Sequence, residues 1–342
     1  MPSYSRIILA KRPEGDIDHE TFKKETVELP SESSLKADQV LVKVAHLSLE
    51  PAMRGWMRGT RSYVPPVKLG ETMRAQGLGT VLAVGTSVKN LKLGDTVECL
   101  PGWAEYAVLS AKNLKKRTPL KGIRITDYLG TLGTPGQTAY WGIIDVGKIK
   151  KGETVVVSGA AGAVGTTVCQ IAKIHGCKVI GIAGGKEKCE WLEKDLGIIA
   201  IDYKDANFHA NVKKLGYLDV YFDNVGGEML DFFLTRLNRH ARIVLCGAIS
   251  QYNAKKPRGL QSYMHLITQR GVMQGLIVFD YKDRYSEAEK QMSQWIAEGK
   301  LKTRDTVLYG LDSCIPGLKG LFRGENTGKM IITLDDSAKA HL

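Results

Sequence analysis

The chain has 342 residues, which is enough for two domains that each bury a hydrophobic core. Hydrophobic residues make up 43% and charged residues 25%, as in an ordinary globular protein, and no apolar run is long enough for a membrane-spanning helix. The net charge of +12 comes from dispersed lysines and arginines, so we expect an anionic small ligand, with no nucleic acid and no membrane as partner.

The cysteines indicate a reducing environment. All six are scattered along the chain, and none forms a Cys-x-x-Cys pair. Residues 1–11 also lack the charged and apolar regions of a secretory signal. We therefore predict a cytoplasmic protein.

Residues 1–126 are expected to form a β-rich domain. Apolar or alternating runs at Val40–Val44, Gly77–Val84 and Thr96–Cys99 are separated by turn residues. Gly55–Glu71 shows no periodicity and is expected to be a long loop, a feature that is usually functional in compact domains.

Residues 127–303 are expected to form an α/β domain, in which strand and helix patterns alternate. That alternation predicts a doubly wound parallel sheet with right-handed crossovers. A polar-faced helix is expected at Tyr285–Glu298. The segment 304–342, strand-like from Thr306 to Leu334, is expected to return to the first domain. The predicted strands are Thr154–Val157, Lys178–Ile182, Ala200–Asp202, Val220–Asp223, Ile243–Gly247 and Val272–Val278.

A glycine-rich turn follows the first of these strands. Gly159, Gly162 and Gly165 stand between a β-branched run and a helical pattern, at the spacing of one βαβ unit. Glycines let the backbone approach a pyrophosphate, and the helix N-terminus offers free N–H groups to it. We therefore expect a dinucleotide to bind across Gly162, Ala163, Val164 and Gly165, in preference to a plain α/β crossover.

The end of the second strand predicts which dinucleotide binds. An NAD site needs an acidic residue about 20 residues after the glycine turn, to accept a hydrogen bond from the ribose 2′-hydroxyl. That position is near Gly184, and it is followed by Gly185, Lys186 and Lys188. The glycines leave room for a 2′-phosphate and the lysines can neutralise it, so NADP(H) is favoured. The alternative interpretation is a solvated helix start.

The sequence contains no recognisable zinc site. The N-terminal half offers His19, His46 and a single cysteine, Cys99, with no cysteine near His46. His46 lies in an alternating run and is better explained as a structural histidine. We predict no metal, so other groups must stabilise charge during reduction.

Two more strand ends carry polar groups that could do so, since ligands bind at the carboxyl ends of parallel strands. Asn224 follows one strand and precedes Gly226 and Gly227, which allow close backbone approach. Cys246 and Tyr252 follow the next strand, and a phenol there could donate to an oxyanion. The alternatives are that Asn224 caps a helix and that Tyr252 packs at a domain seam.

At these residues the chain resembles a known family, the zinc-independent medium-chain dehydrogenase/reductases of the alkenal double-bond reductase type. That group includes prostaglandin reductases (leukotriene B4 dehydrogenases) and curcumin-reductase-like proteins. The resemblance covers almost the whole chain. The matching segments are Glu50–Gly55, Gly102–Tyr106, Leu132–Tyr140, Ser158–Gly165, Asp223–Gly227, Cys246–Asn253 and Gly324–Lys329.

The resemblance implies a GroES-like catalytic domain, a Rossmann domain that binds NADP, and homodimers. It implies NADPH-dependent reduction of the C=C bond of α,β-unsaturated ketones and aldehydes. The residues matching Lys188 and Tyr203 contact the 2′-phosphate in that family, and those matching Asn224 and Asn326 also contact the cofactor. The tyrosine matching Tyr252 lies near the nicotinamide. Gly184 and Cys246 are expected in the same cofactor site.

One position departs from the family pattern. Ala52 stands where many members have a tyrosine that lines the substrate pocket, so the family's substrate range does not transfer to this chain. We expect Met53, Trp56 and Tyr63 to line the pocket, with Trp56 and Tyr63 refilling the space.

The expected reaction passes a hydride to the β-carbon, with Tyr252 or water protonating the α-carbon. Tyrosine is protonated at neutral pH and can donate without tuning. Two other functions stay open, an NADPH quinone oxidoreductase of the same superfamily and a non-catalytic protein that binds NADPH and RNA.

Overall fold

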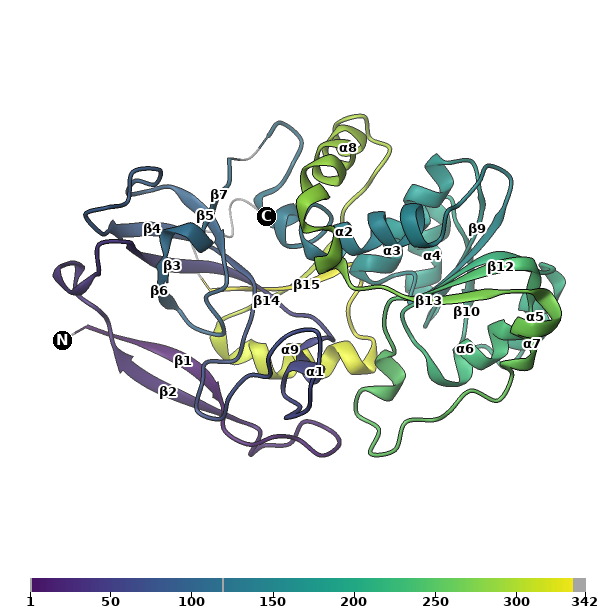
Figure 1. The fold of residues 1–342 in the computed structure, drawn as a ribbon, viewed down its shortest axis with the longest axis horizontal. Helices are drawn as coiled ribbons and strands as arrows, with labels where there is room; N and C mark the ends of the chain where they lie inside the picture. The colour runs from purple at the N-terminus through teal and green to yellow at the C-terminus, as the bar shows by residue number, and fades with distance from the viewer. Residues whose placement is uncertain (1, 119, 335–342) are drawn as a thin grey trace. The chain divides into compact units, whose positions relative to one another are not determined.

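The computed structural model describes residues 2–118 and 120–334. The chain divides into two compact units, one made of Met1–Leu129 and Asp305–Leu342 and the other of Gly130–Arg304 (Figure 1). The last residues of the predicted segment 304–342, numbers 335–342, lie outside the described residues. The α/β fold with a β-rich N-terminal part is confirmed.

The first unit is built on antiparallel pairing. Its described strands form a ribbon of β1 with β2 and a larger sheet in the order β14-β15-β3-β4-β5-β7, with β6 also paired to β3. The predicted strands Gly77–Val84 and Thr96–Cys99 have the observed bounds, and Val40–Val44 is part of the longer β3. The bounds are β1 Ser3–Leu9, β2 Phe22–Glu28, β3 Gln39–Ser48, β4 Gly77–Val84, β5 Thr96–Cys99, β6 Tyr106–Ser110, β7 Lys115–Lys116, β14 Asp305–Tyr309 and β15 Lys329–Thr333.

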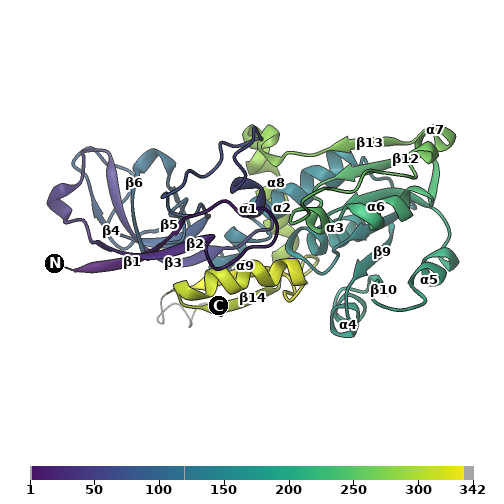
Figure 2. The same cartoon turned by 90° about the horizontal axis from the view of Figure 1, so that it is seen from below.

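The C-terminal tail of the described chain pairs with this sheet. Strand β15 runs antiparallel to β3 and parallel to β14. In the sequence between β14 and β15 the chain forms helix α9, Cys314–Arg323, so the prediction of strand-like structure throughout Thr306–Leu334 was wrong there (α9 is labelled in Figure 2). A helix forms there because the apolar residues Cys314, Leu318 and Leu321 have a helical spacing and are all buried in the unit's core.

The second unit contains a parallel sheet with the strand order of dinucleotide-binding folds. Its described strands run in the order β10-β9-β8-β11-β12-β13, and every pair is parallel (Figure 1). Counted from the first strand of the unit, this is the order 3-2-1-4-5-6. The bounds are β8 Thr154–Ser158, β9 Lys178–Ala183, β10 Ile199–Asp202, β11 Leu218–Asp223, β12 Leu237–Leu245 and β13 Val272–Gly275.

Two predicted strands of this unit differ from the observed ones by more than two residues. Strand β12 begins at Leu237, six residues before the predicted start at Ile243, because its early residues are polar and partly exposed and so break the apolar pattern. Strand β13 ends at Gly275 and is the edge strand, and its continuation forms a 3₁₀ helix at Val278–Arg284.

Helices connect these strands. Their bounds are α1 Met53–Trp56 in the first unit and α2 Thr134–Trp141, α3 Ala163–Ile174, α4 Lys186–Lys194, α5 Phe208–Lys214, α6 Gly227–Leu234, α7 Met264–Gln269 and α8 Tyr285–Ala297 in the second. Shorter 3₁₀ turns occur at Glu32–Ser34, Ala111–Asn113, Ile125–Leu129, Ile249–Gln251 and Leu311–Ser313, and a π turn at Gly142–Val146. In the described part of the chain, no helix has the length and apolarity needed to cross a membrane.

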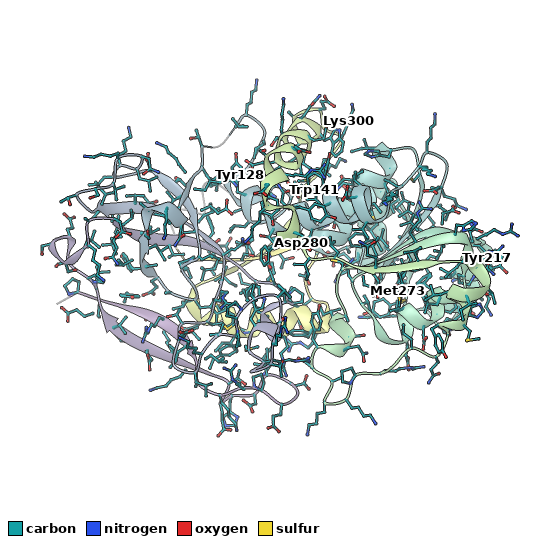
Figure 3. The ribbon with its side chains drawn as sticks, viewed as in Figure 1. Tyr128, Trp141, Tyr217, Met273, Asp280 and Lys300 are labelled. Atoms are coloured by element: carbon teal, nitrogen blue, oxygen red, sulfur yellow. The ribbon has the colours of Figure 1, made fainter. Side chains whose placement is uncertain are left out.

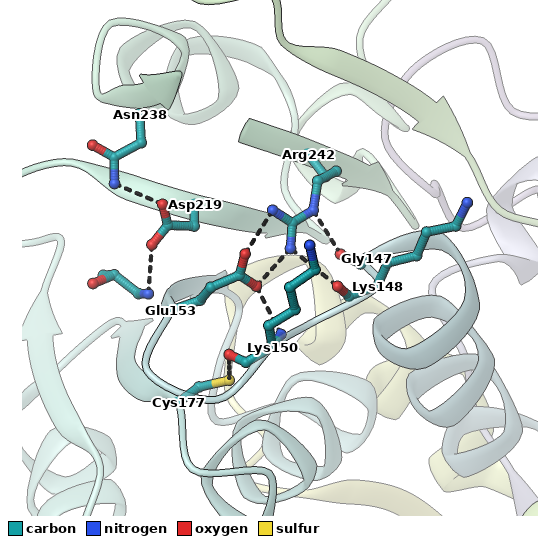
Figure 4. A network of polar contacts seen from close by, with 9 residues as sticks. Gly147, Lys148, Lys150, Glu153, Cys177, Asp219, Asn238 and Arg242 are labelled. Carbon is teal, nitrogen blue, oxygen red and sulfur yellow. Dashed lines mark hydrogen bonds and ion pairs between the residues drawn. The ribbon is translucent and has the colours of Figure 1, made fainter. Parts of the chain in front are cut away.

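The amino ends of the parallel strands are closed by a polar network (Figure 4). Arg242 donates to both carboxylate oxygens of Glu153, at 2.9 and 2.6 Å, and to the carbonyl oxygens of Gly147 and Lys148. Asp219 accepts from the Thr154 backbone N–H, at 2.8 Å, and from the amide of Asn238. The starts of β8, β11 and β12 are thereby joined by groups whose hydrogen bonds are satisfied.

Candidate cofactor and active site

The glycine turn brings helix α3 very close to the end of β8. Gly159 has φ +59°, which favours glycine. A Cβ atom on Gly165 would lie 2.2 Å from the carbonyl oxygen of Gly159, so position 165 admits no side chain without moving the backbone. The third glycine of the motif therefore sets the approach of helix to strand.

The first turn of α3 fits a pyrophosphate. Gly162 is its N-cap, and no side chain caps this 12-residue helix. The first N–H groups of a helix have no partner within it and carry partial positive charge. Gly162, Ala163 and Val164 are partly exposed, whereas the helix is buried from Gly165 to Ala172. The accessible end of α3 can thus hold an anion on backbone donors.

The ends of β9 and β10 carry the residues predicted to bind the 2′-phosphate. The ring of Tyr203 lies on Gly184, where a Cβ would be 2.6 Å from the ring atom Cε1. Lys188, in the first turn of α4, is partly buried, and this burial, followed by the positive charge of Lys204, lowers the pKa of its ammonium. The cations Lys188 and Lys204 and the ring of Tyr203 thus stand near the ends of β9 and β10. Two cations suit a dianionic group such as a 2′-phosphate.

The end of β11 is tied to the end of β8. Asp223 is fully buried and accepts hydrogen bonds from the Ser158 hydroxyl, at 2.8 Å, and from the backbone N–H of Gly226. Burial raises the pKa of Asp223, and these donors oppose the rise. The side-chain amide of Asn224 donates to the Ser158 carbonyl oxygen at 2.7 Å. Asn224 does not cap a helix, because Gly226 is the N-cap of α6.

The segment after β12 holds the predicted proton donor. The hydroxyl oxygen of Tyr252 accepts a hydrogen bond from the Ala248 backbone N–H at 3.1 Å. It also lies 3.0 Å from where a Cβ on Gly247 would stand, so a side chain there would crowd it. Cys246 is a thiol rather than a thiolate, because burial and then the nearby Asp223 carboxylate raise its pKa to about 12.

In the first unit, the loop predicted to line the substrate pocket is internally bonded. The predicted loop Gly55–Glu71 has no helix or strand from residue 57 to 71, whereas its first two residues belong to α1. The indole N–H of Trp56 donates to the Tyr63 hydroxyl at 3.2 Å, so these two predicted pocket residues are in contact. Tyr63 is 47% exposed. Arg12 closes the loop by donating to the carbonyl oxygens of Met57 and Val67.

Two other predicted residues of this unit are engaged internally. Met53 is fully buried in the unit's hydrophobic core, beside Met57 and Met73, which is the environment of a core residue. The side chain of Asn326 donates to the Gly328 carbonyl oxygen at 2.8 Å and so braces its own loop. Their predicted roles in substrate and cofactor binding stay predictions.

In residues 2–118 and 120–334 there is no group of three or more His, Cys, Asp and Glu side chains arranged to hold a metal ion. The Nδ1 atom of His46 lies 3.0 Å from the Thr333 hydroxyl oxygen, between the paired strands β3 and β15. This is the structural role expected for His46.

Known proteins resemble the chain over nearly its whole length. Residues 5–116 match the family described as the N-terminal domain of oxidoreductase, and residues 163–298 match the family described as zinc-binding dehydrogenase. The chain is 43% identical to the putative NADP-dependent oxidoreductase YfmJ of Bacillus subtilis, over 98% of each chain. It belongs to the medium-chain dehydrogenase/reductase superfamily.

Other members of this superfamily have named activities. The chain is 37% identical to the NADPH-dependent curcumin reductase of Escherichia coli, over 96% of each chain. It is 38% identical to the NADP⁺-dependent 2-alkenal reductase of Nicotiana tabacum, over 86% of this chain and 87% of that one. The structure of CurA from Vibrio vulnificus in complex with NADPH superposes with a TM-score of 0.90 at 38% identity, covering 97% of this chain and 99% of CurA.

The structure adds residues of this medium-chain dehydrogenase/reductase that the sequence patterns did not single out. Asp223 and Ser158 join two strand ends, Asp202 joins two others, and Arg12 closes the loop after α1. Asp202 and Asp223 carried one signal, because each is an acid that ends a predicted strand. The other contacts join residues distant in sequence, which periodicity does not report.

Proposed function

We propose that this protein is an NADPH-dependent reductase of the C=C bond of α,β-unsaturated ketones and aldehydes. The observation that carries the proposal is the row of groups along the carboxyl edge of the parallel sheet. A helix N-terminus, a cationic strand end and a held tyrosine hydroxyl follow one another there. The names of the curcumin and 2-alkenal reductases agree with this reaction.

NADP(H) would be held along that edge. Gly162, Ala163, Val164 and Gly165 suit its pyrophosphate, for which α3 supplies backbone N–H groups. Gly184, Lys188 and Tyr203 would surround the 2′-phosphate, and Asn224, Cys246 and Asn326 complete the residues that we assign to the cofactor. When bound, the reduced cofactor supplies the hydride.

Tyr252 is the residue that we assign to proton donation. Its oxygen accepts a hydrogen bond from the Ala248 N–H, which holds the phenol in place, and a phenol hydroxyl can donate as well as accept. A tyrosine is protonated at neutral pH, so it can stabilise the enolate oxygen by a hydrogen bond or protonate the α-carbon.

We assign the substrate pocket to the first unit, the GroES-like catalytic part, with Met53, Trp56 and Tyr63 as its residues. The bonded pair of Trp56 and Tyr63 gives this pocket a rigid aromatic wall. Ala52 stands where many relatives have a tyrosine, and we expect Trp56 and Tyr63 to refill that space, so a panel of enones must establish the substrate range.

We further propose a cytoplasmic homodimer. Strand β13 is the edge strand of the parallel sheet, so one row of its backbone groups is unpaired by that sheet. Met273 lies on this strand (Figure 3). Exposed apolar side chains gather on β13 and on the neighbouring segment and helix α7, which suits a second copy of the chain: Tyr263, Met264, Ile267 and Val272. Light scattering after size-exclusion chromatography tests this; a monomer at micromolar concentration would refute it.

The test of the reaction is NADPH oxidation with a panel of enals, enones and quinones, followed by product analysis. We expect the saturated ketone or aldehyde as product and NADPH preferred to NADH. Turnover of quinones alone would identify a quinone oxidoreductase. NADPH binding without turnover of any compound would identify a binding protein.

A further inference from the structure

The carboxylate of Asp202 lies where β10 ends beside β9. Asp202 pairs with Ala183 in the parallel register, and this is the last residue pair between β10 and β9. The Tyr203 backbone N–H then donates to the Ala183 carbonyl oxygen at 3.0 Å. Beyond this pair the two segments diverge: β9 continues into the Gly184–Gly185 turn, and β10 continues into Tyr203 and Lys204.

One carboxylate oxygen of Asp202 is hydrogen-bonded to the backbone of both segments. Its Oδ1 atom accepts from the Gly185 backbone N–H at 2.9 Å and from the Lys204 backbone N–H at 2.9 Å. Gly185 has φ +97°, a conformation that residues other than glycine rarely adopt. The bond from Asp202 therefore fixes a turn that would otherwise have wide conformational freedom.

The groups fixed in this way are those assigned to the 2′-phosphate. The turn presents Gly184 to the ring of Tyr203, with no space for a Cβ between them. The turn also leads into α4, where the Cys189 N–H donates to the Gly185 carbonyl oxygen and where Lys188 lies. On the other side, the backbone of Lys204 is bonded to the same carboxylate oxygen.

We propose that Asp202 is a positioning residue for the 2′-phosphate subsite, because its Oδ1 atom locks the Gly184–Gly185 turn to the Tyr203–Lys204 segment. Lys204 is then a second cation of that subsite, besides Lys188. This inference rests on the proposed function, and it adds to it the element that gives the subsite its shape.

The charge and the acceptor oxygen of Asp202 have opposite effects on binding of the 2′-phosphate. Its negative charge repels a phosphate, so removing the charge alone strengthens anion binding. Its acceptor oxygen organises the subsite, so displacing that oxygen weakens binding of the 2′-phosphate. Electrostatic and positional roles are thus separable by substitutions that change one property at a time.

The experiment measures binding of adenosine 2′,5′-bisphosphate and of adenosine 5′-monophosphate to the full chain by isothermal titration calorimetry. The ratio of the two dissociation constants reports the 2′-phosphate alone and needs no turnover. Asp202→Asn keeps an acceptor oxygen in place and removes the charge, so we expect the ratio to stay within about twofold of wild type or to move toward tighter 2′-phosphate binding.

Asp202→Glu keeps the charge and displaces the oxygen by one methylene. We expect it to lose roughly tenfold of the preference for the bisphosphate, and Asp202→Ala to lose at least as much, with the monophosphate little affected. Asp205→Asn is the matched control: its carboxylate is exposed, accepts a local hydrogen bond from the Asn207 N–H at 2.7 Å, and carries the same charge three residues away. It should leave the ratio nearly unchanged.

A ratio that Asp202→Glu and Asp202→Ala leave intact overturns the proposal, and so does Asp202→Asn behaving like Asp202→Ala. If Asp202→Ala fails to fold, the asparagine and glutamate variants still decide between position and charge. If the wild-type chain itself prefers the monophosphate, the cofactor assignment of the proposed function fails instead, which is a different result.

Discussion

The two ends of the parallel sheet differ in how their charged and polar groups are arranged. At the amino ends, Arg242, Glu153 and Asp219 bond to one another's segments, and each charged group is matched by a partner within the network (Figure 4). At the carboxyl ends, the cations Lys188 and Lys204 stand near each other and beside the donor-rich end of α3. One end is closed for stability, and the other keeps binding capacity for a ligand.

The acidic residues at the carboxyl end, Asp202 and Asp223, have a structural role there. Asp202 and Asp223 accept hydrogen bonds from backbone N–H groups, at 2.9 Å from Gly185 and at about 3 Å from Gly226. They thereby fix the shape of the turns at this end of the sheet. Substitutions at the carboxyl end should therefore change binding and catalysis, and substitutions at the amino end should change stability.

The largest effect is expected for Tyr252→Phe, which removes the hydroxyl bonded to Ala248. We expect kcat with an enone to fall about 100-fold, or about 2.7 kcal/mol, as for loss of one oxyanion donor. Tyr217→Phe is the control, since Tyr217 is an exposed tyrosine just before β11, at the other end of the sheet (Figure 3). An unchanged kcat in Tyr252→Phe would assign proton donation to water or to a hydroxyl of the cofactor.

Next in size is Lys188→Ala, which removes a partly buried cation from the strand end. A charge-assisted contact contributes about 2 kcal/mol, so we expect the Kd for NADPH to rise roughly 30-fold and the Kd for NADH to stay within about twofold. Fluorescence titration measures both. Lys186→Ala, in the same turn but exposed and 3.6 Å from Glu190, is the control. Equal weakening of NADH binding would contradict a role at the 2′-phosphate.

At the amino end, Arg242→Ala should lower the free energy of unfolding by about 2 kcal/mol, because it removes the ion pair with Glu153 and the donor to two carbonyl oxygens. Urea denaturation measures the loss. Arg239→Ala is the control, since Arg239 is an exposed arginine on the same strand, β12. The Kd for NADPH should not change in either variant, and a large change in Arg242→Ala would show that the two ends are coupled.

The smallest effect concerns pH and Glu153. Burial pushes its pKa upward, but the hydrogen bonds and charge of Arg242 and the Lys150 N–H outweigh burial and hold the pKa below the ordinary value. A carboxyl group with a lowered folded-state pKa stabilises the fold above its unfolded pKa of about 4.3 and loses this contribution as the pH falls through the folded pKa.

Glu153→Gln should therefore be less stable than wild type by about 1 kcal/mol at pH 7, and the difference should shrink as the pH falls below about 4. Thermal melting of both proteins across this range measures it. A difference that is constant with pH would mean that the charge of Glu153 contributes nothing.

The sequence was sufficient for the features that local patterns encode. The β-branched run of β8, the glycine turn and the helix α3 follow one another in 21 residues, from Thr154 to Ile174, so periodicity and turn chemistry locate them. The choice of NADP(H) over NAD(H) was also predictable, because it depends on a single position near Gly184, where an acidic residue is missing. Helix α9 was missed because Gly317 and Gly320 interrupt its pattern and are explained only by close packing on Leu49 and Glu325.

What the tertiary structure alone decided is how separate strand ends are joined. Asp202 meets Gly185 across 17 residues and Ser158 meets Asp223 across 65, and no periodicity relates such pairs. The sequence placed each predicted group at the end of its own strand, because strands and turns are local. Only the order of the strands in the sheet makes neighbours of those ends, because burial of the whole sheet, rather than any local preference, selects that order.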